Sequence, residues 1–190
     1  MTSLIIIFLI TGIISGFMAG LLGVGGGIII VPISYFVLLF LDYSPDYAMH
    51  IAIASSLGVI CFTSISSIRS HIKLKNVNFI ILRTWVPGIV LGSIIGSYSA
   101  SIISGDILVN IFICLAFLIA LNMAFQKEPI IISADLPNSK FVNLIISSLI
   151  GFLSVLIGIG GGSFSVPTLT MFSKKIHEAV GTSATLGFFI

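Results

Sequence analysis

One glycine-rich apolar segment occurs twice in this chain, and the repeat constrains the fold more than any other feature of the sequence. Residues 16–32 read GFMAGLLGVGGGIIIVP, and residues 151–167 read GFLSVLIGIGGGSFSVP. In both copies Gly-x-Gly-Gly-Gly interrupts an apolar run, and a Val-Pro pair follows about one helical turn later. Because glycine adopts backbone conformations that end a helix, each copy predicts a broken helix. The chain is therefore predicted to contain two copies of one unit.

The composition indicates a membrane protein. Charged residues make up 7% of the chain and hydrophobic residues 57%, and the mean hydropathy is +1.27. Soluble domains carry about 25% charged residues, which help to cover an apolar core. Apolar stretches occur at 4–22, 27–41, 46–68, 77–103, 107–125, 141–157, 163–173 and 176–190. Several of them reach the roughly 20 residues that a ~30 Å hydrocarbon core requires, so we expect an all-α polytopic membrane protein in a lipid bilayer.

The positions of the basic residues predict how these stretches are oriented. Lys and Arg are concentrated at 69–76 and at both ends of the polar connection 126–140, so the positive-inside rule makes these loops cytoplasmic. The stretch with the second glycine motif is the fifth after the one with the first, and this odd number of crossings predicts inverted repeats. If 4–22 and 27–41 formed one broken helix, the copies would instead be parallel. The net charge of +2 is too small to indicate a nucleic-acid partner.

A second pair of matching segments sets the boundaries of the two units. His50-Ile-Ala-Ile-Ala-Ser-Ser matches His177-Glu-Ala-Val-Gly-Thr-Ser, and in this alignment Ile190 corresponds to Thr63. The second unit therefore has no counterpart for the later part of the first, which predicts a truncated second repeat. The predicted domains are a first transmembrane repeat at 1–125, a cytoplasmic connecting loop at 126–140 and an incomplete second transmembrane repeat at 141–190.

The repeated segments predict a binding site for a small anion. Where a membrane helix breaks, the next half-helix presents unpaired N–H groups and a partial positive charge at its N-terminus. Small hydroxyl side chains in the following helix would add hydrogen bonds. Two such breaks from inverted repeats would meet near the middle of the membrane around one ion. The predicted substrate-binding residues are Gly23, Gly25, Gly26, Gly27, Ser55, Ser56, Gly158, Gly160, Gly161, Gly162, Ser163, Thr182 and Ser183.

Packing is the alternative role for glycine in a membrane helix, since small residues let two helices approach closely. The spacing of Gly88, Gly92 and Gly96 by four residues within one stretch favours packing there. Three consecutive glycines point in different directions around a helix, so the two triplets favour binding. His50 and His177 precede the hydroxyl residues, and for them both a capping role and contact with the ion stay open.

The sequence offers no arrangement typical of an enzyme, a metal site or a cofactor site. Ser64 or Ser66 with His71 is the nearest pairing of a nucleophile with a base, and nothing in the sequence orients it. The predicted function is transport of a small anion by alternating access, without catalytic residues, metal ligands or cofactors. A passive anion channel or pore, which also uses helix breaks and small residues, is the alternative. The oligomeric state is not indicated.

The paired motifs resemble those of a known family. Gly-x-Gly-Gly-Gly with Val-Pro, followed by a Gly-Thr-Ser-like segment, is similar to the TauE/SafE family of membrane transporters. The second copy reads Gly181-Thr182-Ser183, and the first departs from this pattern as Ala54-Ser55-Ser56. The resemblance implies a multi-pass permease of a bacterial-type cell (inner) membrane whose substrate is sulfite or a small organosulfonate. It also implies that the glycine loops and the hydroxyl segments contact the substrate.

Overall fold

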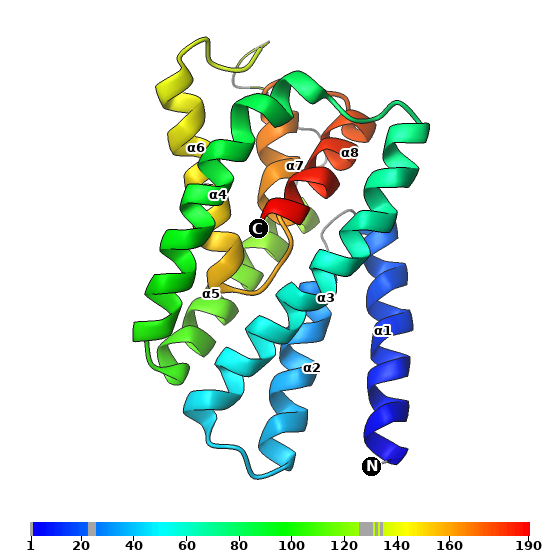
Figure 1. Cartoon of the computed structure of the whole chain (residues 1–190), viewed down its shortest axis with the longest axis vertical. Helices are drawn as coiled ribbons and strands as arrows, with labels where there is room; N and C mark the ends of the chain where they lie inside the picture. The colour runs from blue at the N-terminus through cyan, green and yellow to red at the C-terminus, as the bar shows by residue number, and fades with distance from the viewer. Residues whose placement is uncertain (1, 23–25, 126–130, 132, 134) are drawn as a thin grey trace.

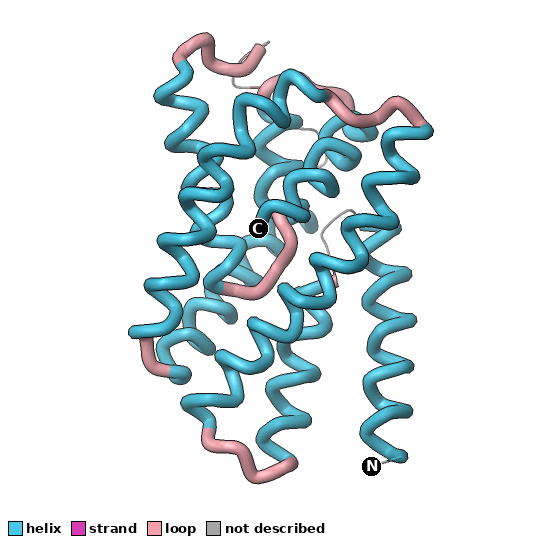
Figure 2. Tube along the Cα trace, viewed as in Figure 1, coloured by secondary structure: helices cyan, strands magenta, loops and turns pink. Residues whose placement is uncertain are grey.

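The computed structural model describes residues 2–22, 26–125, 131, 133 and 135–190, and these residues form helices and loops without any strand (Figure 2). Each α helix overlaps one of the predicted apolar stretches, which confirms the all-α fold class. A 3-10 helix, Gly187–Phe189, follows the last of them. The α helices are α1 (Thr2–Leu22), α2 (Gly27–Phe40), α3 (Pro45–Lys73), α4 (Phe79–Ile102), α5 (Gly105–Phe125), α6 (Lys140–Leu156), α7 (Gly162–Met171) and α8 (Ile176–Leu186).

The helices differ in how far they extend along the long axis of the molecule (Figure 1). α3 and α4 run along most of this axis. α1 begins and α2 ends near the lower end of the view, and the other ends of both helices lie part-way up. α6 begins and α7 ends near the upper end, and the loop 157–161 between them lies at mid-height. The two helix pairs therefore extend toward opposite ends of the molecule.

α4 and α6 form the most extensive helix contact, and small residues make it possible. A Cβ atom at Gly88 would overlap Ser147, and one at Gly92 would overlap the backbone carbonyl of Ser148. At Gly96 an added Cβ atom would lie 2.9 Å from the carbonyl oxygen of Phe152. Larger side chains would separate the two helices. This confirms the predicted packing role of these glycines.

Two polar side chains buried beside this contact, Trp85 and Asn143, are hydrogen-bonded to each other. Trp85 is fully buried, and its Nε1 donates to Asn143 Oδ1 at 3.0 Å. The amide Nδ2 of Asn143 donates in turn to the carbonyl oxygen of Ser139 at 3.0 Å. Because a buried polar group without a partner costs about 1–3 kcal/mol, this pairing stabilises the position of α4 against the start of α6.

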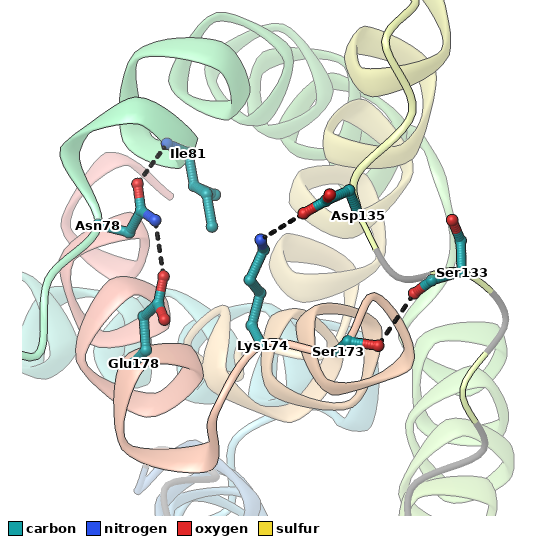
Figure 3. A network of polar contacts seen from close by, with 7 residues as sticks. All are labelled: Asn78, Ile81, Ser133, Asp135, Ser173, Lys174 and Glu178. Atoms are coloured by element: carbon teal, nitrogen blue, oxygen red, sulfur yellow. Dashed lines mark hydrogen bonds and ion pairs between the residues drawn. The ribbon is translucent and has the colours of Figure 1, made fainter.

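Asn78 joins the start of α4 to α8 (Figure 3). Its Oδ1 accepts hydrogen bonds from the backbone N–H groups of Ile80 and Ile81, at 3.0 and 3.1 Å, so it caps the helix. Its Nδ2 donates to Glu178 Oε1 on α8 at 2.6 Å, and its backbone N–H donates to Thr182 Oγ1 at 3.0 Å. One side chain and its backbone thus connect two distant parts of the chain.

Two further contacts attach the segment before α6 to the connection between α7 and α8 (Figure 3). Lys174 Nζ lies 3.1 Å from Asp135 Oδ1, and Ser173 Oγ donates to the carbonyl oxygen of Ser133 at 3.1 Å. The side chain of Asp135 is 84% exposed. Ion pairs in such positions are screened by solvent and contribute about 0–1 kcal/mol.

These contacts predict unequal effects of substitution on stability. Asn78→Ala removes the cap of α4 and the bond to Glu178, and we expect a loss of at least about 1 kcal/mol in the free energy of unfolding. Lys174→Ala removes only the exposed ion pair, and we expect a loss of less than about 1 kcal/mol. Thermal unfolding of both variants in detergent measures the difference. Equal losses would contradict the assigned importance of the cap.

Apolar side chains cover the outside of the molecule. Three of the described helical segments are long and apolar enough to cross a membrane: Pro45–Lys73, Phe79–Ile102 and Gly105–Asn122. Ile13 on α1 is 72% exposed, and Ile80 on α4 is 80% exposed. Exposed apolar surface of this kind is unfavourable in water and favourable in lipid. The structure therefore supports the prediction of a membrane protein.

Candidate functional site

A cavity of about 610 Å³ lies where the two copies of the glycine motif come together. Its wall includes parts of α1, one side of α3 and part of α8. Gly26 of the first motif lines it together with Gly160, Gly161 and Gly162 of the second, and Ser183 of α8 adds a hydroxyl group. A volume of this size is within the range of pockets that hold small molecules. The structure thus brings five of the predicted site residues to one cavity.

Two helices begin at this cavity. Gly26 is the N-cap residue of α2 and Gly161 is the N-cap residue of α7, and neither helix has a side chain that caps it. The first N–H groups of a helix have no partner within that helix. They also carry the positive end of the helix dipole. Both starts therefore favour a negatively charged or oxygen-rich ligand nearby.

The two copies of the motif also contact each other directly through their backbones. A Cβ atom on Gly27 would overlap the carbonyl oxygen of Gly158 and would lie 2.8 Å from Ile159 Cα. Gly158 has a φ of +63°, a left-handed conformation that costs other residues about 1–2 kcal/mol. Only glycine at both positions permits this approach without strain. Neither residue lines the cavity.

Ser56 holds the loop of the second motif against α3. Its side chain is fully buried, and its Oγ donates to the carbonyl oxygen of Gly158 at 2.7 Å. Ser55, its neighbour, is exposed on the outside of α3. Adjacent residues on a helix point about 100° apart, so the two hydroxyl groups do not share one environment. Of the predicted pair, Ser56 joins the two copies and Ser55 is away from both the cavity and this contact.

The second pair of predicted hydroxyl residues is divided in the same way. Ser183 is 1% exposed and lines the cavity, and its Oγ has no hydrogen-bond partner among the described residues. Thr182 is fully buried and lies outside the cavity lining, where its Oγ1 accepts the hydrogen bond from the backbone of Asn78. Ser183 is therefore the hydroxyl that a ligand in the cavity could use, and Thr182 is occupied in the fold.

The remaining predicted site residues are placed as follows. Ser163 is 5% exposed in the first turn of α7 and is not part of the cavity wall. Gly23 and Gly25 lie outside the described residues.

The two recurring histidines lie outside the cavity. His50 Nε2 lies 3.0 Å from the carbonyl oxygen of Ala100 and 3.1 Å from that of Ile103. It therefore connects the start of α3 to the end of α4, which is a structural role. His177 is exposed in the first turn of α8.

One wall of the cavity was missed by the prediction from sequence. The third apolar stretch was expected to end at residue 68 with a loop at 69–76, but α3 continues to Lys73. Its basic residues are exposed near the helix end, so they do not interrupt it. Spacings of three and four residues put several polar groups on one side of the helix. The polar residues of α3 that line the cavity are Thr63, Ser64, Ser66, Ser67, Ser70 and His71.

Comparison with known proteins finds relatives that are described as probable membrane transporters. The chain is 34% identical over its whole length to a probable membrane transporter protein of Haemophilus influenzae, and the match covers 72% of that protein. It is 32% identical to the probable membrane transporter protein YunE of Bacillus subtilis, with 96% of this chain and 74% of that protein matched. A probable membrane transporter protein of Methanocaldococcus jannaschii is 36% identical, with 93% of this chain and 66% of that protein matched. Comparison with solved structures gives no significant match.

The family assignment rests on nearly the whole chain. The sequence profile of the sulfite exporter TauE/SafE family matches residues 8–190, which include both glycine motifs and every wall of the cavity. The three relatives are described as probable membrane transporters, and two of them match this chain at more than 30% identity over more than two thirds of their length. This chain is a membrane transporter of the sulfite exporter TauE/SafE family.

Proposed function

We propose that this protein moves a small oxyanion, sulfite or a small organosulfonate, across the cell membrane. The observation that carries the proposal is the cavity at which Gly26 meets Gly160, Gly161 and Gly162. Two uncapped helix starts at one cavity provide N–H donors for an anion from two directions. The substrate class follows the name of the family, whose profile matches the chain.

The mechanism that we propose is alternating access between two inverted repeats. The α1–α2 pair extends toward one end of the molecule and the α6–α7 pair toward the other, which supports an inverted relation between the copies (Figure 1). The backbone contact between Gly27 and Gly158 lies between these pairs. Rocking of one unit against the other around this contact would open the cavity to each side of the membrane in turn.

The bound anion would be held by neutral donors. No Lys or Arg is among the described residues that line the cavity. Ser183 Oγ is buried and has no hydrogen-bond partner in the described part of the chain, so it is ready to donate to an oxyanion. Neutral donors bind less tightly than a fixed cation would, and a transported ion must also be released. This chemistry fits transport better than permanent binding.

Ser183→Ala is expected to weaken substrate binding and to leave stability unchanged. The variant removes a hydrogen bond to a charged ligand, worth about 1.5 kcal/mol, so KM should rise about tenfold. It removes no hydrogen bond within the described protein. Thr182→Val should do the reverse, because it removes the acceptor for Asn78 and lowers thermal stability. Uptake kinetics and thermal unfolding of both variants separate the two roles.

Uptake of labelled sulfite by proteoliposomes that contain the full chain tests the proposed function. Saturation with rising substrate concentration, and stimulation by unlabelled sulfite on the opposite side, are expected for alternating access. A linear, unsaturable flux would instead indicate a passive pore. If neither sulfite nor any sulfonate moves faster than in empty vesicles, the proposed substrate class is wrong.

A further inference from the structure

We propose that His71 binds the proton that accompanies the anion, so that this transporter couples anion movement to a proton gradient. The inference rests on the proposed function, because it concerns the same cavity. Among the described residues that line this cavity, His71 is the only one with a side chain that titrates near neutral pH. The other described residues of the lining are glycines, hydroxyl residues or apolar residues.

The imidazole is placed for exchange of a proton with the cavity. Its Nδ1 is buried, and no described residue offers that atom a hydrogen-bond partner. A buried polar atom without a partner costs about 1–3 kcal/mol, and such atoms are rare in native structures. His71 lies in the last turn of α3. Ile60, on the same helix, lines the other end of the cavity, where it is next to Gly160. These eleven residues of helix put the histidine about 16 Å from the glycine end of the cavity.

The wall between these two ends suits water and protons. Thr63 Oγ1 donates to the carbonyl oxygen of Val59 at 3.0 Å, and Ser64 Oγ donates to that of Cys61 at 2.9 Å. Ser70 Oγ likewise donates to its own helix, at 3.2 Å. Because these hydroxyl protons are used within α3, the oxygen atoms present lone pairs that accept hydrogen bonds. Such a wall orders water rather than an anion, and water conducts protons toward His71.

The charged groups nearby do not line the cavity. Arg69 and Lys73 lie on the same helix as His71, and Lys75 follows in the turn. Glu178 and His177 lie on α8, where the carboxylate of Glu178 accepts the hydrogen bond from Asn78. The α1, α2 and α7 sequences contain no charged residue. Among the described residues of the cavity wall, His71 is therefore the one whose charge can change in response to a bound anion.

The coupled step is a simple proton transfer. A proton from water in the cavity adds to the unprotonated ring nitrogen of the neutral imidazole, and the resulting imidazolium adds a positive charge to the wall of the cavity that holds the anion. The favourable interaction links the two events, since an anion in the cavity favours the protonated histidine and the protonated histidine favours the anion. When the anion leaves, the N–H bond breaks again and the proton returns to water on the same side. One proton thus moves with each anion.

The test measures anion and proton movement together in proteoliposomes with a pH-sensitive dye in the lumen. The probes are labelled sulfite and methanesulfonate, and the proteins are the wild type, His71→Gln and the matched control His177→Gln. We expect anion uptake by the wild type to acidify the lumen. We also expect the rate of uptake to fall by about tenfold as the external pH rises through the two units that span a histidine titration. His71→Gln should lose both effects, and His177→Gln should keep both. Sulfite itself titrates equally for all three proteins, so differences between them belong to the histidine.

The outcomes separate the coupling from the proposed function. The coupling is overturned if the wild type takes up the anion without acidifying the lumen. It is also overturned if His71→Gln still acidifies the lumen. Both results leave the transport function intact. If no probe is transported by the wild type, the proposed function fails and the coupling fails with it. Because Nδ1 has no partner among the described residues, the substitution should not unfold the protein. If His71→Gln is nevertheless misfolded, His71→Asn replaces it in the same comparison.

Discussion

Gly27→Ala is expected to abolish transport and to destabilise the protein. The added Cβ atom would overlap the carbonyl oxygen of Gly158 and would lie 2.8 Å from Ile159 Cα. Both obstacles are backbone atoms, so no rotation of a side chain relieves the overlap. Overpacking of this kind costs about 1–3 kcal/mol, and the cost is larger where the backbone must shift. The loop that would move carries Gly160 and Gly161 at the cavity and leads into Gly162, the first residue of α7.

Two other glycines, Gly58 and Gly26, provide the controls for this variant. Gly58 on α3 is exposed, and an added Cβ atom there meets nothing within 4 Å, so Gly58→Ala should keep both stability and transport. At Gly26 an added Cβ atom would lie 3.3 Å from the flexible end of Ile30. Gly26→Ala should therefore fold but narrow the cavity. Thermal unfolding in detergent and sulfite uptake in proteoliposomes measure these effects. A Gly27→Ala variant that unfolds and transports like the wild type would contradict the proposed contact.

The helices could be predicted from the sequence because the apolar stretches end at polar or glycine-rich segments. α2 and α7 begin within the glycine motifs, and α4 begins directly after Asn78, whose side chain is suited to capping. The close α4–α6 packing was also foreseeable, since Gly88, Gly92 and Gly96 share one side of a helix. These features depend on short segments of chain. Local sequence is sufficient to specify them.

The details of the site could be predicted only in part, because they depend on which side of a helix faces the cavity. Ser55 with Ser56, and Thr182 with Ser183, were predicted as pairs, although adjacent helical residues point in different directions. The sequence alone does not say which member of each pair faces inward. The bond from Ser56 to Gly158 joins residues far apart in the chain, and only tertiary packing creates it. His71 was assigned to a loop, and its position in the cavity wall follows from the full length of α3.

Ser56→Ala is expected to lower both stability and transport. The variant removes the hydrogen bond to the carbonyl oxygen of Gly158 and leaves that oxygen buried without this donor. The expected cost is about 1–3 kcal/mol in the free energy of unfolding, or about 2–4 °C in Tm for each kcal/mol. The loss of this bond also frees the loop that positions the second glycine motif at the cavity. We therefore expect a lower maximal rate of sulfite uptake than in the wild type.

Ser55→Ala is the matched control, because it makes the same chemical change one residue away. Ser55 is exposed on α3, so its substitution should change stability by less than about 0.5 kcal/mol and leave uptake unchanged. The comparison isolates the contribution of the bond between the two copies, since helix propensity and side-chain size change equally in both variants. Indistinguishable melting temperatures and uptake rates for the two variants would show that the Ser56–Gly158 bond does not hold the loop. A selective loss in Ser56→Ala would instead place the contact between the copies within the transport mechanism.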